Sequence, residues 1–82
     1  MDKPREYLKK LRMDKGMTAT EVALSFGITK QYYSLIETGV NQKRMDITLV
    51  RKIADLFGVT LDWVAEQEQL LYDAEEKDGE SA

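Results

Sequence analysis

Cysteine and histidine are both absent from this chain of 82 residues. Without cysteine it can form neither a disulfide nor a thiolate metal site, and without histidine it lacks the commonest general base and metal ligand. The sequence also has no Gly-rich phosphate loop and no obvious carboxylate pair beside a cleft. We therefore expect no enzyme activity, no metal and no cofactor.

Long hydrophobic runs are missing as well. No apolar stretch approaches the ~20 residues needed to cross a bilayer, and the start, Met1 to Pro4, lacks the apolar region of a signal peptide. Hydrophobic residues make up 43% of the chain, enough for a modest core in one small domain. We expect a soluble cytoplasmic protein without a membrane partner.

The net charge of −3 conceals an uneven distribution. Residues 1–52 hold eleven Lys and Arg against six Asp and Glu, whereas residues 53–82 hold one Lys against nine acidic residues. The basic N-terminal part can bind the phosphates of a nucleic acid, whereas the acidic C-terminal part is repelled by them. The alternative is that these charges only solvate the surface.

Helical periodicity divides the chain into five segments, and no segment shows the short β-branched alternation of a strand. Glycines follow the apolar stretches, where a left-handed helix end favours a residue without Cβ, and Thr18 with Glu21 fits a capping box. The expected helices span about 4–15, with Pro4 in the first turn, 19–26, 30–38, 47–57 and from 61 as far as 72. The expected inward-facing residues are Leu8 and Leu11 in the first helix, Ile47, Val50, Ile53, Ala54 and Phe57 in the fourth, and Leu61 and Val64 in the fifth.

Residues 1–72 are thus expected to form one compact all-α domain. Residues 73–82 are acidic and small and lack apolar anchors, so we expect a disordered tail there.

The second and third segments carry the most informative pattern. Ala23 is small enough for two helices to cross closely, and Gly27 permits a tight turn between them. The inner faces of this pair carry Val22, Phe26, Ile28, Tyr33 and Ile36. Such an arrangement is a helix-turn-helix, which lays its second helix into the major groove of DNA.

The outer face of segment 30–38 supplies the candidate base contacts. Lys30 can donate to guanine, and Gln31 can pair with adenine. Ser34 can bond a base or a phosphate. Leu35 can meet a thymine methyl group, although it could instead pack under the fourth helix or contact a protein. For Lys30 and Gln31 the alternative is an ordinary solvated helix surface. Further candidates for DNA contact on this helix are Tyr32, through its hydroxyl, and Thr38.

Two other places offer phosphate contacts. Backbone amides at the start of segment 19–26, at Thr18 and Ala19, can bind a phosphate with the aid of the helix dipole. Lys43 and Arg44 add positive charge to the loop after the third helix; the alternative for these two is loop solvation.

Residues from about 8 to 65 resemble the phage repressor and Cro family of helix-turn-helix domains, also called XRE-type. The matching residues are Leu11-Arg12, Gly16-Met17-Thr18, Glu21-Val22-Ala23, Phe26-Gly27-Ile28-Thr29, Ser34, Ile36-Glu37, Gly39, Ile53-Ala54 and Gly58-Val59-Thr60-Leu61-Asp62. The resemblance implies a five-helix, lambda-repressor-like fold and a recognition helix at 30–38. It also implies a dimer on a palindromic operator and a buried, structural salt bridge between Arg12 and Glu37.

The chain departs from that family pattern at several positions. Ala19 stands where many relatives carry a glutamine that touches phosphate, and Leu35 stands where many carry a polar residue. The loop of residues 40–45 is about two residues longer than usual and lacks the customary proline. The phosphate contact at the start of segment 19–26 therefore depends on the backbone amide alone.

Near the C-terminal end, the expected core leaves several large apolar side chains without an obvious partner. They are Trp63, Leu70, Leu71 and Tyr72. An isolated apolar patch on a small domain often marks an interface, so we expect a homodimer contact there; the alternative is a lid folded back on the domain. The function expected is that of a dimeric, Cro-like repressor of a phage or mobile element. The alternative is a protein-interaction module, such as an antitoxin or anti-repressor, that binds a protein partner through the C-terminal region.

Overall fold

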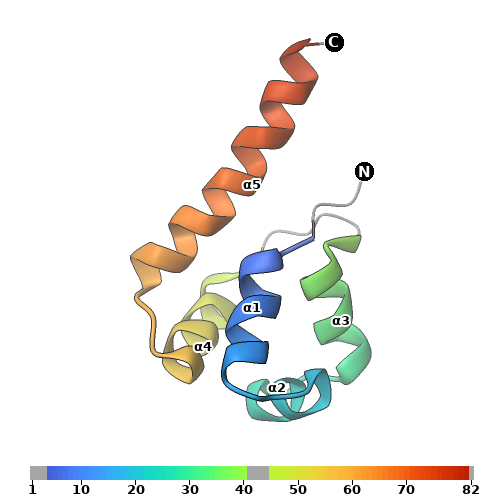
Figure 1. Cartoon of the computed structure of the whole chain (residues 1–82), viewed down its shortest axis with the longest axis vertical. Coiled ribbons are helices and arrows are strands. Elements are labelled where there is room, and N and C mark those ends of the chain that lie inside the picture. The colour runs from blue at the N-terminus through green and yellow to red at the C-terminus, as the bar shows by residue number, and fades with distance from the viewer. Residues whose placement is uncertain (1–3, 41–44, 82) are drawn as a thin grey trace.

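The protein forms five α-helices in the part of the chain that the computed structural model describes, residues 4–40 and 45–81 (Figure 1). Side chains are described up to residue 71. The helices are α1 (Glu6–Asp14), α2 (Ala19–Phe26), α3 (Lys30–Thr38), α4 (Ile47–Phe57) and α5 (Leu61–Ser81). The expected all-α class and five-helix architecture are confirmed, and the bounds of α2, α3 and α4 agree with those predicted.

Local chemistry explains where the helices begin and end. Thr18 and Glu21 form a reciprocal capping box, in which the Glu21 amide donates to the Thr18 hydroxyl and the Thr18 amide donates to the Glu21 carboxylate. Thr29 and Asp46 cap α3 and α4 through their own side-chain oxygens. Gly27 ends α2 with φ 72, a left-handed conformation that glycine adopts without steric cost, and this turn leads directly into α3.

One hydrophobic core joins all five helices. Its buried members are Leu8, Val22, Ala23, Phe26, Tyr33, Ile36, Leu49, Ile53 and Val64. At the crossing of α2 and α3, the rings of Phe26 and Tyr33 meet edge to face with centroids 6.2 Å apart, a favourable arrangement for an aromatic pair. Lys52 of α4 donates a 2.7 Å hydrogen bond to the Phe26 carbonyl oxygen at the end of α2, where a cation also complements the helix dipole.

The structure corrects three predictions about the helix faces and ends. Helix α1 begins at Glu6, so Pro4 lies outside its first turn. Ile47, expected to face inward, is 64% exposed. The buried face of α4 contains Leu49 and Ile53, and Ile47, two residues before Leu49, lies on the opposite side of the helix. Leu61 is also exposed, at the very start of α5, whereas the core position one turn later is filled by Val64.

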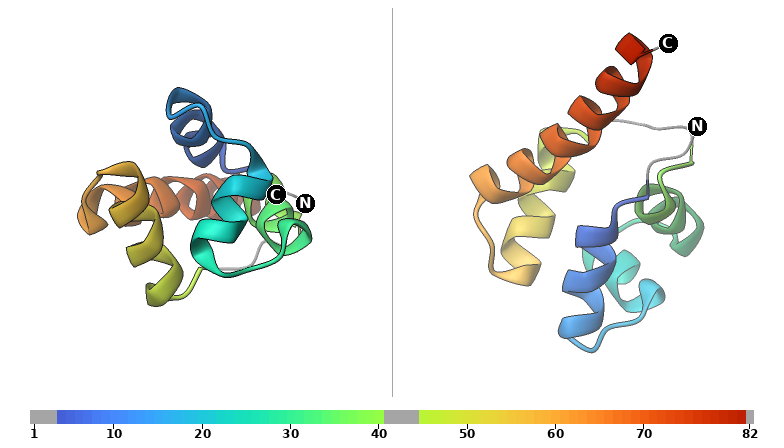
Figure 2. Two further views of the ribbon diagram at one scale, coloured as in Figure 1. Left: turned by 90° about the horizontal axis from the view of Figure 1, so that it is seen from below. Right: turned by 45° about the horizontal axis from the view of Figure 1, so that its top comes forward.

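Helix α5 extends well beyond the other helices (Figures 1 and 2), and the principal extents of the molecule are 40 × 25 × 22 Å. Its backbone is helical to Ser81, whereas the sequence predicts disorder from residue 73. Ala, Glu and Lys in this segment favour helix, and a helix nucleated by a packed first half extends at low cost. Among the described residues, no helix has both the length and the apolar character to cross a membrane.

Candidate nucleic-acid interface

Helix α3 has one buried face and one open face. Tyr33 and Ile36 face the core, whereas Lys30, Gln31 and Thr38 are exposed. Tyr32 is exposed as well, and Ser34 is half-buried. The other helices therefore leave the polar flank of α3 open to solvent, which is the geometry that a recognition helix needs to enter a groove.

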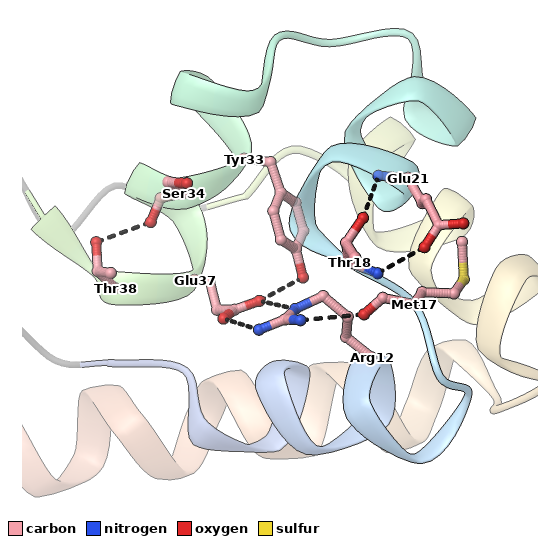
Figure 3. Close-up of polar contacts among 8 residues, drawn as sticks. All are labelled: Arg12, Met17, Thr18, Glu21, Tyr33, Ser34, Glu37 and Thr38. Carbon is pink, nitrogen blue, oxygen red and sulfur yellow. Dashed lines mark hydrogen bonds and ion pairs between the residues drawn. The ribbon is translucent and has the colours of Figure 1, made fainter.

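Leu35 shares this open face and is 42% exposed. It therefore does not pack into the core beneath α4, which was one of its alternatives. The Thr38 hydroxyl donates a 2.8 Å hydrogen bond to the Ser34 carbonyl oxygen (Figure 3). Such back-bonding satisfies the hydroxyl hydrogen within the helix, so Thr38 has only its oxygen lone pairs left to meet a nucleic acid.

At the start of α2, fewer backbone amides are available to bind a phosphate than the sequence predicts. The amides of Thr18 and Glu21 are both used in the capping box, and the Glu21 carboxylate lies at this helix end. A phosphate at the same place would have to approach that negative charge. The Ala19 residue, the remaining candidate at this end, is half-buried and packs against the core.

A polar network fastens α3 to α1. Arg12 binds the Glu37 carboxylate with both prongs of its guanidinium, Nε to Oε2 at 2.9 Å and Nη2 to Oε1 at 3.0 Å (Figure 3). The remaining Arg12 nitrogen, Nη1, donates to the Met17 carbonyl oxygen at 3.1 Å. The Tyr33 hydroxyl adds a 2.7 Å hydrogen bond to Glu37 Oε2. The Arg12 and Glu37 side chains are only 16% and 13% exposed, so the structure contains the pair that the family resemblance implies.

Electrostatics in this network favour the charged pair and a neutral phenol. Burial of the Glu37 carboxyl raises its pKa, but the hydrogen bonds from Arg12 and Tyr33 outweigh burial and the net pKa is lowered. The hydrogen bond to Glu37 raises the pKa of Arg12. Burial and the same carboxylate raise the pKa of the Tyr33 hydroxyl. The sequence places Tyr33 in the core but does not predict its bond to Glu37; their i, i+4 spacing was the available signal.

A second ion pair was not predicted at all. Arg5 binds the Glu68 carboxylate of α5 through Nε at 2.8 Å and Nη2 at 3.0 Å, and the Tyr7 hydroxyl donates to the same carboxylate at 2.5 Å. Arg5 is buried and Glu68 is partly buried. Burial, together with the hydrogen bond to Glu68, raises the pKa of Tyr7. The Tyr7 ring also meets Trp63 edge to face, with centroids 5.7 Å apart.

The residues expected at a dimer contact differ in their burial and in their contacts. Trp63 is half-buried and packs against Tyr7 of the same chain, so part of its surface is used within the domain. Leu70 is 57% exposed and Leu71 is half-buried. Because α5 continues as one helix through both positions, they do not form a lid folded back over the core. Lys43, Arg44 and the side chain of Tyr72 lie outside the described residues.

Comparison with known proteins gives the same assignment as the geometry. A family model described as helix-turn-helix matches residues 8–64, a range that includes all of α2, α3 and α4. An uncharacterized HTH-type transcriptional regulator, YqaF of Bacillus subtilis (strain 168), is 37% identical over 59 residues, which cover 72% of this chain and 72% of that protein. No solved structure matches the chain. The chain therefore belongs to the helix-turn-helix family of Cro- and C1-type domains, which bind DNA and are not enzymes.

Proposed function

We propose that the protein is a transcriptional regulator that binds a specific double-stranded DNA operator through α3 and represses by occupying it. The observation that carries the proposal is the exposure of Lys30 and Gln31 at the start of α3 while Tyr33 and Ile36 anchor the opposite face. The Bacillus relative is itself named a transcriptional regulator. The resemblance to phage repressors supports a role in a phage or mobile element.

The open face of α3 suggests how the operator is read. Lys30 and Gln31 lie in the first turn of α3, the part of a recognition helix that reaches base edges. Lys30 suits guanine and Gln31 suits adenine. Leu35 offers an exposed apolar side chain whose fitting partner is a thymine methyl group, and Ser34 lies beside it to bond a base or a phosphate.

Contacts with the DNA backbone complete the proposed interface. We assign them to the Tyr32 hydroxyl, the Thr38 oxygen, the Ala19 amide beside Thr18, and the loop residues Lys43 and Arg44. Contacts of this kind position a protein on the duplex without reading its sequence, so their loss should weaken binding to all sequences alike.

A homodimer would place two copies of α3 on one operator. The exposed Leu70 of α5, with its neighbours Leu71 and Tyr72 and the half-buried Trp63, supports an interface between two copies. Two-fold dimers of this kind bind half-sites one DNA turn apart, about 34–36 Å. The acidic composition of residues 73–82 would keep this end away from the duplex.

A second candidate is a protein-interaction module, such as an antitoxin or anti-repressor. Two exposed leucines on different helices favour it, Leu70 on α5 and Leu24 on α2, the latter 75% exposed. A gel shift across genomic fragments at several salt concentrations separates the candidates. The proposed regulator requires fragments bound about 10³-fold more tightly than random DNA. Equal retardation of all fragments, or none, would favour the protein-interaction module.

A further inference from the structure

Arg5 touches the recognition helix and α5 at the same time. Its guanidinium Nη1 donates a 2.7 Å hydrogen bond to the Ile36 carbonyl oxygen of α3. Its Nε and Nη2 bind the Glu68 carboxylate of α5, and the Tyr7 hydroxyl holds that carboxylate from a further side. One buried side chain thus spans two helices that lie far apart in the sequence.

The Arg5 backbone strengthens this hold on α3. Its amide donates a 2.8 Å hydrogen bond to the Glu37 carbonyl oxygen. The carbonyls of a helix's last turn lack partners within the helix, and here Arg5 supplies donors to two neighbouring ones, at Ile36 and Glu37. Arg5 itself is the N-cap of α1, with φ −88 and ψ 77, so its amide is not needed within that helix.

Two networks meet at Glu37. Arg12 and Tyr33 hold its side-chain carboxylate, while Arg5 holds its backbone carbonyl. A continuous series of hydrogen bonds therefore leads from Glu68 on α5 through Arg5 to the end of α3. Through Arg12 it continues to the Met17 carbonyl oxygen just before α2.

A buried ion pair is weak evidence of a stabilising role. A buried ion pair can often be replaced by apolar residues without loss of stability, because its attraction barely offsets the desolvation of both charges. A bidentate arginine instead contributes direction, since its planar fork accepts only one geometry of the carboxylate. Arg5 is further constrained by its bonds to Ile36 and Glu37, so directional bonds from one residue join α3 to α5.

We propose that Arg5, held by Glu68 and Tyr7, is a positioning residue that sets the orientation of the recognition helix and thereby the selectivity of the domain for its operator. This inference rests on the proposed function. It assigns no DNA contact to Arg5, which is buried. If the homodimer forms through α5, the same orientation also sets the separation of the two recognition helices.

The test compares Glu68→Gln with Glu66→Gln, a matched control on the exposed side of α5 that removes the same charge. The readout is the ratio of Kd for random duplex to Kd for the selected operator, measured where circular dichroism shows every protein fully folded. We expect Glu68→Gln to lower this ratio about tenfold, the effect of one hydrogen bond to a charged group, with an unchanged salt slope. The control should leave the ratio unchanged. Arg5→Lys keeps the charge but cannot span both helices, so it should lower the ratio as Glu68→Gln does.

A lower melting temperature of Glu68→Gln with an unchanged ratio would overturn the proposal and leave the cluster a purely stabilising role. Amide hydrogen exchange gives a readout without DNA. Positioning predicts that Glu68→Gln speeds exchange in the last turn of α3 at least tenfold relative to the core amides of α4, whereas equal acceleration in both helices contradicts it. If the wild-type protein selects no operator, the proposed function fails, and exchange alone decides whether Arg5 holds α3.

Discussion

The Tyr33 hydroxyl donates a 2.7 Å hydrogen bond to the Glu37 carboxylate, one turn further along α3. The same carboxylate receives both prongs of Arg12 from α1. Both acceptor oxygens are therefore engaged by donors from two helices, and the buried face of α3 is tied to α1. This attachment is what leaves the opposite face, with Lys30 and Gln31, turned outward.

Removal of the Glu37 side chain should strongly destabilise the domain. Glu37→Ala leaves the Arg12 guanidinium, 16% exposed, without its counter-charge, at an expected cost of about 3 kcal/mol in the free energy of unfolding. Urea denaturation followed by circular dichroism measures this cost. Glu66→Ala, on an exposed position of α5, serves as the control. A loss within the roughly 0.5 kcal/mol typical of surface substitutions would contradict the structural role of the pair.

The same carboxylate predicts how stability depends on pH. The net pKa of Glu37 is lowered in the folded protein, so near pH 4 the unfolded state binds more protons and stability rises with pH. The contribution of Glu37 is therefore fully present above its usual pKa of about 4.3 and is lost as the pH falls through the lower folded value. Free energies of unfolding measured across this acid range should fall less steeply for Glu37→Gln than for the wild type. Parallel curves would contradict the lowered pKa.

Lys43 provides a test of the proposed backbone contacts. If its ammonium group neutralises one phosphate, Lys43→Gln should reduce the magnitude of the negative slope of log Kobs against log salt by about 1. The same substitution should weaken binding to all duplexes alike. Lys10→Gln, on the exposed face of α1, removes the same charge without a proposed contact and should leave the slope unchanged. An unaltered slope for Lys43→Gln would assign this side chain to solvent.

The homodimer proposal is tested by Leu70→Lys. A charge at this exposed position should separate the copies, because burying an unpaired ammonium in an interface is costly, while the fold of each copy stays intact. Sedimentation velocity should then show a monomer where the wild type shows a dimer. Leu24→Lys is the matched control, since Leu24 is even more exposed but lies on α2. A dimer that survives Leu70→Lys would place the interface elsewhere.

Much of the fold could be predicted because its signals are local. The caps Thr18 and Thr29 and the turn residue Gly27 stand directly at the helix ends that they define. The start and end of α2 and the start of α3 follow from them. Ile47 shows the limit of such reasoning, because an apolar residue at a helix start can fall on either side of the buried face.

The Arg5–Glu68 pair lies beyond prediction from a single sequence. Its members are 63 residues apart, and neither belongs to a local pattern that indicates a partner. The assignment of Trp63 to a dimer contact missed its packing against Tyr7 for the same reason. The sequence predicts a shorter last helix than α5, because the acidic composition after residue 72 indicates disorder, whereas Ala, Glu and Lys in the same segment favour helix.

The central claim is that the outward flank of α3 reads DNA sequence. The most direct test is selection of bound duplexes from random DNA, followed by sequencing. It compares the wild type with a double variant that carries both Lys30→Ala and Gln31→Ala, and uses Lys10→Ala as the control. We predict that the wild type and the control enrich one common motif, whereas the double variant, although folded, loses preference at the positions that these two side chains read. Enrichment of the same motif by all three proteins would contradict the claim.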